Sequence, residues 1–411
     1  MKIGGQFGHK GHCLGFIEEP DAIRLHDPEE CEQCGSMLIG ESISYERRQV
    51  IDLVENKKFT TEHRAGAKTC DSCNCTSKAF FPEDVTAPIQ YGPAVKATAT
   101  YINKRQMIPF ARTVEIFADL LGIKLSVGTI VTMVKQASDL LMDVDSALKE
   151  AVQNSPIVNF DESGMNVNGV RHWVHVAVTR VASYFYPHHR RGPEAMNKMG
   201  ILPEFSGFAI HDHWKSYFTY TNSTHCLCNA HHLRELEFIH ERYEHAWAKD
   251  MQEFLREVKK ETEARKEKGF LFISEKKAKL FSDKYDEIIA KGYLEDPLVP
   301  IDPTKKKKRG RVAQSKGRNL LDRLRDFKEA VLGFMNNFSV PFDNNQAERD
   351  VRMLKVQQKI SGTFRSEQGP IDYCRIMSYI STVRKNSINA IEAMKSVFLG
   401  APILPDGLSS G

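Results

Sequence analysis

Three acidic residues that lie far apart in the chain of 411 residues occupy positions from which they can hold divalent metal ions. Asp161 and Asp212 each end a short apolar run that is typical of a β-strand. Glu348 follows Asn344 and Asn345, either of which can cap a helix. If the two strand ends meet at one edge of a sheet and the helix packs there, the three carboxylates form one site.

Such a group of carboxylates suits the cleavage and joining of phosphodiester bonds. That chemistry needs an activated water or 3′-hydroxyl and a stabilised leaving oxygen, and two divalent ions about 3.5–4 Å apart provide both. Mg²⁺ prefers oxygen ligands and keeps several waters, so three carboxylates and a substrate phosphate suffice, and Mn²⁺ can substitute for it. Helical spacing predicts Glu348, Arg352 and Lys355 on one face, where the two cations would contact DNA phosphates. An aspartate at the end of a strand is also a common turn former, so spacing alone leaves a structural role open.

The chain contains two C-x-x-C pairs, Cys31 with Cys34 and Cys70 with Cys73. Together they can supply four thiolates to one structural Zn²⁺. The surrounding residues, 26–78, are polar and short of apolar side chains, which favours a small zinc-binding domain over one held by a core. His63 or Cys75 can replace one ligand, and a redox dithiol is the alternative to zinc.

Composition indicates a folded protein outside the membrane. Hydrophobic residues make up 41% and charged residues 27% of the chain, and the net charge is +4. No apolar run is long enough to span a bilayer, and residues 1–25 form a linker-like lead-in without the apolar core of a signal peptide. We therefore expect a cytoplasmic location, where nine reduced cysteines point to metal rather than to disulfides.

Residues 88–152 have a helical pattern. Gly122 is placed to end one helix and Ser126 to cap the next, an arrangement that resembles a helix-turn-helix in outline. A plain helical hairpin that supports the next domain fits the pattern equally well.

The segment that follows, 153–400, has a mixed pattern that predicts an α/β (α+β) catalytic domain. Strands are expected over 157–161, 172–178, 183–186 and 207–212. Three consecutive strands followed by a fourth, with acids ending the first and fourth, are typical of a ribonuclease H-like fold. The charged helical residues from about 229 to 340 are interpreted as an insertion into that fold.

A basic run, Lys305–Arg311, interrupts the helical segment. Its side chains, Lys306, Lys307 and Arg309 among them, can follow a DNA backbone, although lysine-rich linkers that are merely solvated are common.

Several longer motifs resemble those of one known family. In chain order they are Tyr91-Gly-Pro93, Leu125-Ser-Val-Gly-Thr-Ile130, Asp161-Glu-Ser-Gly164, Val167-Asn-Gly-Val-Arg-His-Trp173, Arg191-Gly192, His211-Asp-His-Trp-Lys-Ser-Tyr217, Cys228-Asn-Ala-His-His-Leu-Arg234 and Asp343-Asn-Asn-Gln-Ala-Glu348. Together they closely resemble the insertion sequence 66 family of DDE transposases, from Gly4 to about Ala390.

The resemblance implies Asp161, Asp212 and Glu348 as the catalytic triad of a ribonuclease H-like fold with a helical insertion. It also implies zinc at the four cysteines of the two pairs. The pair Cys228-x-x-His231 resembles a C-x-x-H motif that follows the second aspartate in many DDE transposases, and is interpreted as supporting the active site. Considered alone, a cysteine and a histidine one helical turn apart are more often packing residues.

The expected function is metal-dependent cleavage and strand transfer at insertion-sequence ends, in the bacterial cytoplasm at the nucleoid. Expected partners are transposon-end and target DNA, further copies of the chain on that DNA and accessory proteins of the same element. The chain begins in a linker that usually follows a DNA-binding segment in this family, so an inactive DNA-binding relic is the alternative. A nuclease that cuts without joining is a third interpretation.

Overall fold

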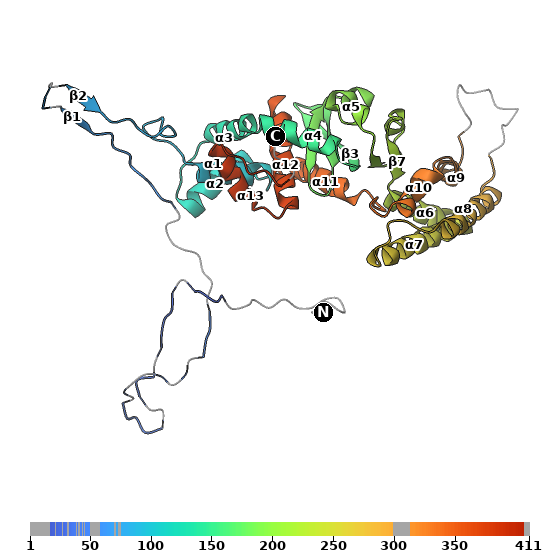
Figure 1. Ribbon diagram of the computed structural model, residues 1–411, viewed down its shortest axis with the longest axis horizontal. Coiled ribbons are helices and arrows are strands. Elements are labelled where there is room, and N and C mark those ends of the chain that lie inside the picture. The colour runs from blue at the N-terminus through green and yellow to red at the C-terminus, as the bar shows by residue number, and fades with distance from the viewer. Residues whose placement is uncertain are drawn as a thin grey trace. The chain divides into compact units, whose positions relative to one another are not determined.

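The computed structural model describes residues 17–20, 22–26, 28–30, 33–37, 39, 42, 44, 46–49, 58–69, 71–72, 75–298 and 313–406. The chain divides into two compact units, Met1–Phe59 and Thr60–Gly411. All helices and strands named below lie in the second unit (Figure 1).

A five-stranded mixed sheet lies at the centre of this unit. Its strands are β3 (Ile157–Val167), β4 (Val170–Val178), β5 (Ser183–His188), β6 (Phe208–His211) and β7 (Thr224–Leu227). They are arranged in the order β5-β4-β3-β6-β7, in which β3, β4 and β5 are antiparallel and β3, β6 and β7 are parallel. A separate two-stranded hairpin pairs β1 (Ala67–Thr69) with β2 (Thr76–Lys78).

The four predicted strands are confirmed, but the predicted end of the first is wrong. β3 continues six residues past Asp161, to Val167, because it forms a long hairpin with β4. The hairpin turn uses Asn168 and Gly169, both with positive φ, as a tight two-residue turn requires. β7 is not among the predicted strands, since its four residues contain a histidine and a cysteine and carry no clear alternation.

Thirteen α-helices lie in the described residues: α1 (Pro93–Lys104), α2 (Phe110–Leu121), α3 (Val127–Leu140), α4 (Met142–Gln153), α5 (Pro193–Met199), α6 (Asn229–Tyr243), α7 (Ala246–Glu267), α8 (Glu275–Glu295), α9 (Lys316–Asp326), α10 (Lys328–Asn336), α11 (Asn345–Ser361), α12 (Gln368–Lys385) and α13 (Ala390–Phe398). None of the described helices combines the length and apolarity needed to cross a bilayer.

The boundaries expected between the early helices are confirmed. Gly122 ends α2 in the left-handed region, with φ of 60°, and the Ser126 hydroxyl accepts the Thr129 N–H at 3.0 Å to cap α3. Pro93 begins α1, because the first helical residue needs no N–H donor.

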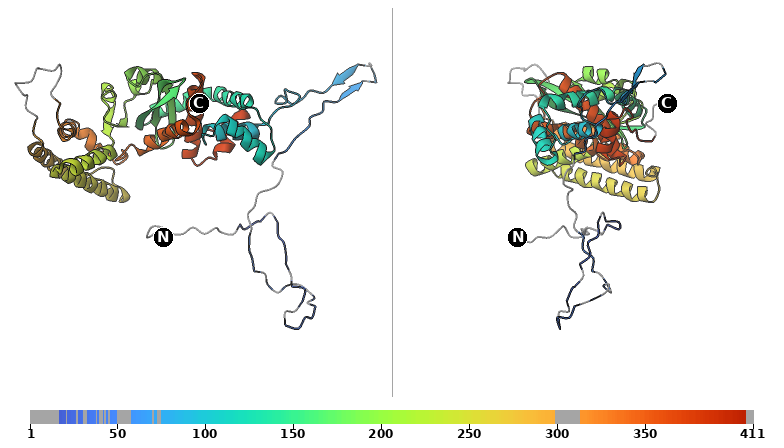
Figure 2. Two further views of the ribbon diagram at one scale, coloured as in Figure 1. Left: turned by 180° about the vertical axis from the view of Figure 1, so that it is seen from behind. Right: turned by 90° about the vertical axis from the view of Figure 1, so that its left-hand side faces the viewer.

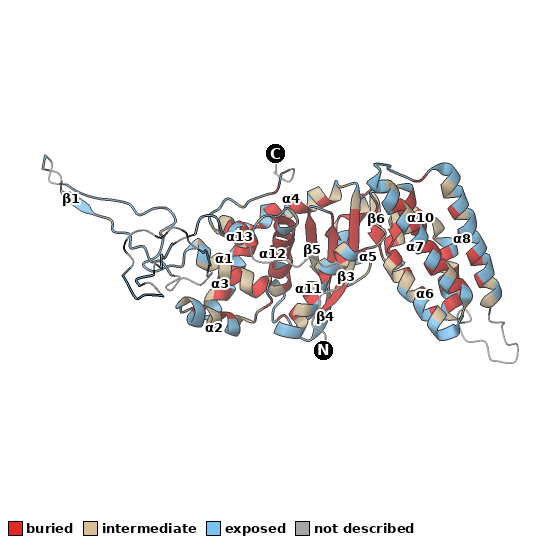
Figure 3. Cartoon of the chain, turned by 90° about the horizontal axis from the view of Figure 1, so that it is seen from below, coloured by how far each residue is buried: buried red, intermediate tan, exposed pale blue. Residues whose placement is uncertain are grey.

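The sheet is covered on both faces (Figure 3). Val174, Val176 and Val178 of β4 face the side covered by α11 and part of α12, where Leu354 is also buried. On the opposite face of the sheet, Ala177 of β4 and Phe160 of β3 belong to a second core, which α1–α4 and α13 complete. This alternation follows from the pleat of the strands, and it decides which side chains can meet α11.

Helices α6–α10, which follow β7 and precede α11 in the chain, form a hydrophobic core of their own. These helices lie to one side of the sheet in Figure 2. The core centres on Trp247, which is fully buried, and it joins the sheet through Ile210 and Cys226. Gly292 of α8 lies against Leu321 and Trp247, and a Cβ there would overlap the Leu321 side chain. The close approach of α8 and α9 therefore depends on a residue without a side chain.

Replacing Gly292 with alanine should destabilise the protein by about 1–3 kcal/mol, because relieving the overlap moves packed side chains. The measurement is the urea midpoint of unfolding, with Glu287→Ala on the exposed face of the same helix as the control. Equal midpoints for both variants would contradict this account of the packing.

Candidate functional site

The first two carboxylates come from neighbouring parallel strands. β3 and β6 pair from Ile157 with Phe208 to Asn159 with Ile210, and the same register, continued by two residues, brings Asp161 beside Asp212. The Asp212 carboxylate accepts the Trp214 N–H at 2.8 Å and the Asp161 carboxylate accepts the Glu162 N–H at 2.8 Å. Each acid is thus fixed by the backbone that follows it.

The third carboxylate approaches from helix α11. Asp161 lies opposite Val176 in the β3–β4 ladder, and Val176 belongs to the sheet face that α11 covers. Val351 and Leu354 bury the inner side of α11 against that face, and Glu348 lies in the first turn of the helix. The strand pleat and the helix therefore direct Asp161 and Glu348 to the same side of the sheet.

The pKa of Asp161 responds to the charges of the other two acids. Burial is the largest cause of a rise in the pKa of Asp161 to about 8, and the negative charges of Glu162, Asp212 and Glu348 contribute to that rise. The Glu162 N–H opposes this rise. A carboxyl group in such surroundings holds its proton near neutral pH unless a cation takes the proton's place.

A fourth acid, Glu162, lies beside the triad and is neutralised by the protein itself. Its carboxylate is 1% exposed, pairs with the Arg191 guanidinium at 2.5 Å and accepts the Tyr217 hydroxyl. Arg191 lies over the rings of Trp214 and Trp173, at 4.2 and 5.1 Å from their centres. The sequence did not indicate Glu162 as a site residue, because the predicted strand ended at Asp161, whereas β3 continues and its pleat turns Glu162 to the opposite face.

Cys228 and His231 both reach Glu348. Cys228 is buried at the N-cap of α6, and its sulfur lies 3.6 Å from Oε1 of Glu348. Nδ1 of His231, in the first turn of α6, lies 3.5 Å from the same oxygen, and the Arg234 guanidinium lies 4.0 Å from Oε2. The C-x-x-H pair therefore belongs to the surroundings of the third carboxylate.

Asn344 links the elements that carry the acids, a role that the sequence did not reveal. It was expected as a helix cap, and it does occupy the N-cap of α11, but its side chain makes no capping bond. Its amide instead accepts from Asn159 Nδ2 and donates to the Phe160 carbonyl, both at 2.8 Å, and its backbone N–H meets the Cys228 sulfur at 3.1 Å. One buried residue thus joins β3, α6 and α11.

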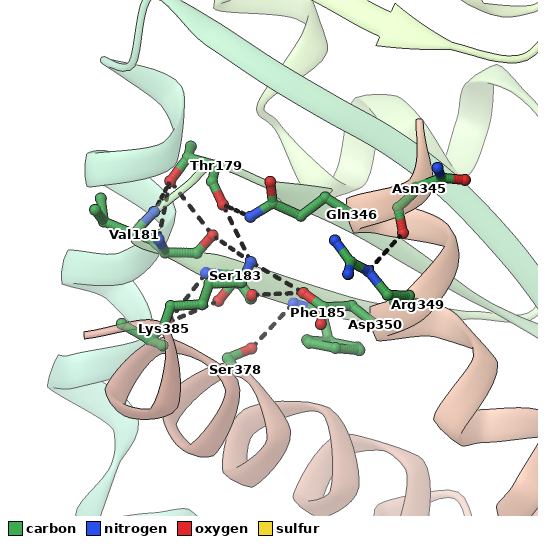
Figure 4. Close-up of polar contacts among 12 residues, drawn as sticks. Thr179, Val181, Ser183, Phe185, Asn345, Gln346, Arg349, Asp350, Ser378 and Lys385 are labelled. Atoms are coloured by element: carbon green, nitrogen blue, oxygen red, sulfur yellow. Dashed lines mark hydrogen bonds and ion pairs between the residues drawn. The ribbon is translucent and has the colours of Figure 1, made fainter. Parts of the chain in front are cut away.

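The far side of α11 is held by a second polar network (Figure 4). Asp350 accepts the Ser183 hydroxyl at 2.8 Å and pairs with the Lys385 ammonium at 3.0 Å. Lys385 also donates to the carbonyl of Thr179 at 3.1 Å, and the Gln346 amide donates to the same carbonyl. These bonds fix the first two turns of α11, and hence Glu348, against β5 and α12.

Comparison with known protein families identifies the chain. The sequence profile described as Transposase IS66 family matches residues 88–370. The chain belongs to the IS66 transposase family. No curated protein matches it.

The cations predicted on α11 of this transposase lie on the exposed side of the helix. Arg352 is exposed, and the Lys355 ammonium donates to the Gly164 carbonyl of β3 at 3.3 Å. Lys306, Lys307 and Arg309 lie outside the described residues.

Of the four cysteines predicted to bind zinc, Cys31, Cys70 and Cys73 lie outside the described residues, and Cys34 is exposed. Among the described residues that flank these cysteines, Glu30 bridges Met37 and Thr69 pairs with Thr76, each antiparallel. The first two residues belong to the Met1–Phe59 unit and the other two to the Thr60–Gly411 unit.

In the magnesium-free transposase, Asp161→Asn should raise stability at pH 8. The folded-state pKa of about 8 lies above the ordinary value of 3.8, so the wild type loses stability as pH rises from about 4 to about 8. The loss is at most about 1.4 kcal/mol per pH unit. In thermal unfolding, the midpoint of the variant should lie above that of the wild type at pH 8, and the two midpoints should be equal near pH 4. The exposed Asp139→Asn is the control. A variant no more stable than wild type at pH 8 would count against the shared site.

Asn344→Ala should destabilise the transposase by about 2–4 kcal/mol, since it leaves the Asn159 amide and the Phe160 carbonyl without partners. Chemical denaturation measures this loss, and the exposed neighbour Asn345→Ala is the matched control. If both variants unfold alike, the linking role assigned to Asn344 is wrong.

Proposed function

We propose that this chain is a DNA transposase that cleaves and joins strands at insertion-sequence ends, with Asp161, Asp212 and Glu348 holding the divalent metal ions. The single observation that supports the proposal most is geometric: the β3–β6 register runs toward Asp161 and Asp212 side by side, and Glu348 lies in the first turn of α11, which covers the same side of the sheet. Membership of a transposase family supports DNA as the substrate.

The proposed fold of this catalytic part is ribonuclease H-like. Three antiparallel strands, β3–β5, are followed by two that run parallel to the first, which is the strand order expected for that fold. Helices α6–α10 lie in the chain between the second and third carboxylates and form the proposed insertion. Because these helices are inserted after β7 and before α11, they lengthen the chain between Asp212 and Glu348 without interrupting the strands or the helix that carry the acids.

The residues present fit a pair of hard divalent ions. All three triad members offer oxygen, and the Arg191 guanidinium is already paired with Glu162. Mg²⁺ or Mn²⁺, when bound, would activate the attacking oxygen and stabilise the leaving oxygen. The chain's own part is to hold three carboxylates in place and to keep Glu162 neutralised, so that the triad is the local excess of negative charge.

Cations near the triad are proposed to hold the DNA. Arg234 is 61% exposed beside Glu348, and Arg352 and Lys355 follow along the exposed side of α11. Lys306, Lys307 and Arg309 would add contacts to phosphates, so binding should weaken steeply with salt.

A structural Zn²⁺ at the two C-x-x-C pairs remains part of the proposal, supported by the sequence pattern of four thiolates. Action on two DNA ends would require a homo-oligomer on DNA, and accessory proteins of the same element are further proposed partners.

Strand transfer of pre-cleaved transposon ends should require Mg²⁺ or Mn²⁺ and each triad carboxylate. Asp212→Ala and Glu348→Gln should lower the rate by about 1000-fold or more, since several kcal/mol of transition-state stabilisation are lost, while DNA binding persists. Asp139→Asn serves as the control. If wild type and Asp212→Ala bind DNA alike and neither joins strands, the chain is a DNA-binding relic instead.

A further inference from the structure

The triad accounts for the oxygens around the site but not for the sulfur and nitrogen that meet the third carboxylate. Cys228, His231 and Glu348 present one ligand atom each, and these atoms all lie within 4.8 Å of one another. Among the described residues, the other such group, His188 with His189 and Glu194, has Arg190 and Lys198 already paired with its carboxylate. A cation is therefore much better accommodated at Glu348.

We propose that Cys228, His231 and Glu348 form a binding site for a tetrahedral transition-metal ion of the Zn²⁺ type, distinct from the all-oxygen triad and sharing Glu348 with it. The distances fit this geometry. Zinc bonds of about 2.3 Å to sulfur and about 2.0–2.1 Å to nitrogen and oxygen place neighbouring tetrahedral ligands roughly 3.3–3.6 Å apart. The sulfur and the imidazole nitrogen lie 3.6 and 3.5 Å from Oε1 of Glu348.

The imidazole of His231 has a buried nitrogen that no hydrogen bond within the described part of the chain satisfies. Its Nδ1 is inaccessible to water and makes no hydrogen bond to any of the described residues, although the rest of the ring is partly exposed. The contact of Nδ1 with Oε1 of Glu348, which the sulfur also approaches, is an ion-pair distance of 3.5 Å and not a hydrogen bond, so the buried nitrogen is poorly satisfied. A bound ion would satisfy it.

The backbone around Cys228 suits a metal-bound thiolate. N–H groups of Asn344, at the N-cap of α11, and of Ala230 and His231, in the first turn of α6, are directed at the sulfur. In the structure the Cys228 thiol donates its proton to Oε1 of Glu348 at 3.6 Å. Binding would release that proton to solvent and leave the sulfur as a ligand already surrounded by N–H groups.

The ligand set also decides which ion is taken. Thiolate and imidazole favour Zn²⁺ and Co²⁺, whereas Mg²⁺ favours oxygen and octahedral geometry. An ion on Cys228 and His231 would withdraw Oε1 of Glu348 from the triad. Given the proposed function, zinc occupancy of this site therefore inhibits strand transfer in Mg²⁺.

The binding test uses the full chain without DNA and Co²⁺ as the probe, because a thiolate ligand gives Co²⁺ a near-ultraviolet charge-transfer absorption. Cys228→Ala should lose the absorption of one thiolate and one equivalent of bound metal, and His231→Ala should bind at least about tenfold more weakly at this site. The matched control is Cys226→Ala, an equally buried cysteine two residues earlier. Any signal from Cys31, Cys34, Cys70 and Cys73 is common to all variants and cancels in the difference.

Identical Co²⁺ spectra and metal content for Cys228→Ala and Cys226→Ala would overturn the proposal and reduce Cys228 and His231 to positioning residues for Glu348. A second arm adds Zn²⁺ to strand transfer in Mg²⁺. Zn²⁺ should inhibit wild type at a concentration at least about tenfold lower than Cys228→Ala, each compared with its own uninhibited rate. A wild type that binds Co²⁺ through Cys228 but joins no strands would refute the proposed function alone.

Discussion

Holding several carboxylates together against their mutual repulsion is the constraint around which this structure is organised. Asp161 is partly buried and faces the charges of Glu162, Asp212 and Glu348, which makes its ionised form costly. The fold neutralises Glu162 with Arg191 and Tyr217. Among the described residues, Asp161 and Asp212 form no ion pair, and the Arg234 guanidinium lies 4.0 Å from Glu348. The remaining negative charge is a site for cations.

Rigid neighbours sustain this arrangement. The Asn344 amide ties β3 to α11, and the ion pair of Asp350 with Lys385 secures the other side of that helix. The buried alternation of β3 and β4 turns Asp161 toward α11 rather than toward Tyr217. Glu348 is thus placed by bonds that do not involve its own carboxylate, so repulsion at the site cannot easily displace it.

The sequence predicted the elements better than their junctions. Alternating apolar runs located four of the five central strands, and Gly122 and Ser126 located helix ends, because these signals are local. The extension of β3 past Asp161 depends on its partner β4, and the links made by Asn344 depend on residues about 185 positions away, so neither has a local signal. The C-x-x-H pair was visible as a motif, but its contact with Glu348 required the fold.

Diffraction from crystals of the chain soaked in Mn²⁺ tests the central claim most directly, because anomalous scattering locates the ion without assuming its ligands. The account predicts Mn²⁺ within coordination distance of carboxylate oxygens of Asp161 and Asp212, with Glu348 completing the site. Manganese found elsewhere, or a Glu348 side chain that remains remote from a metal bound between the two aspartates, would contradict it.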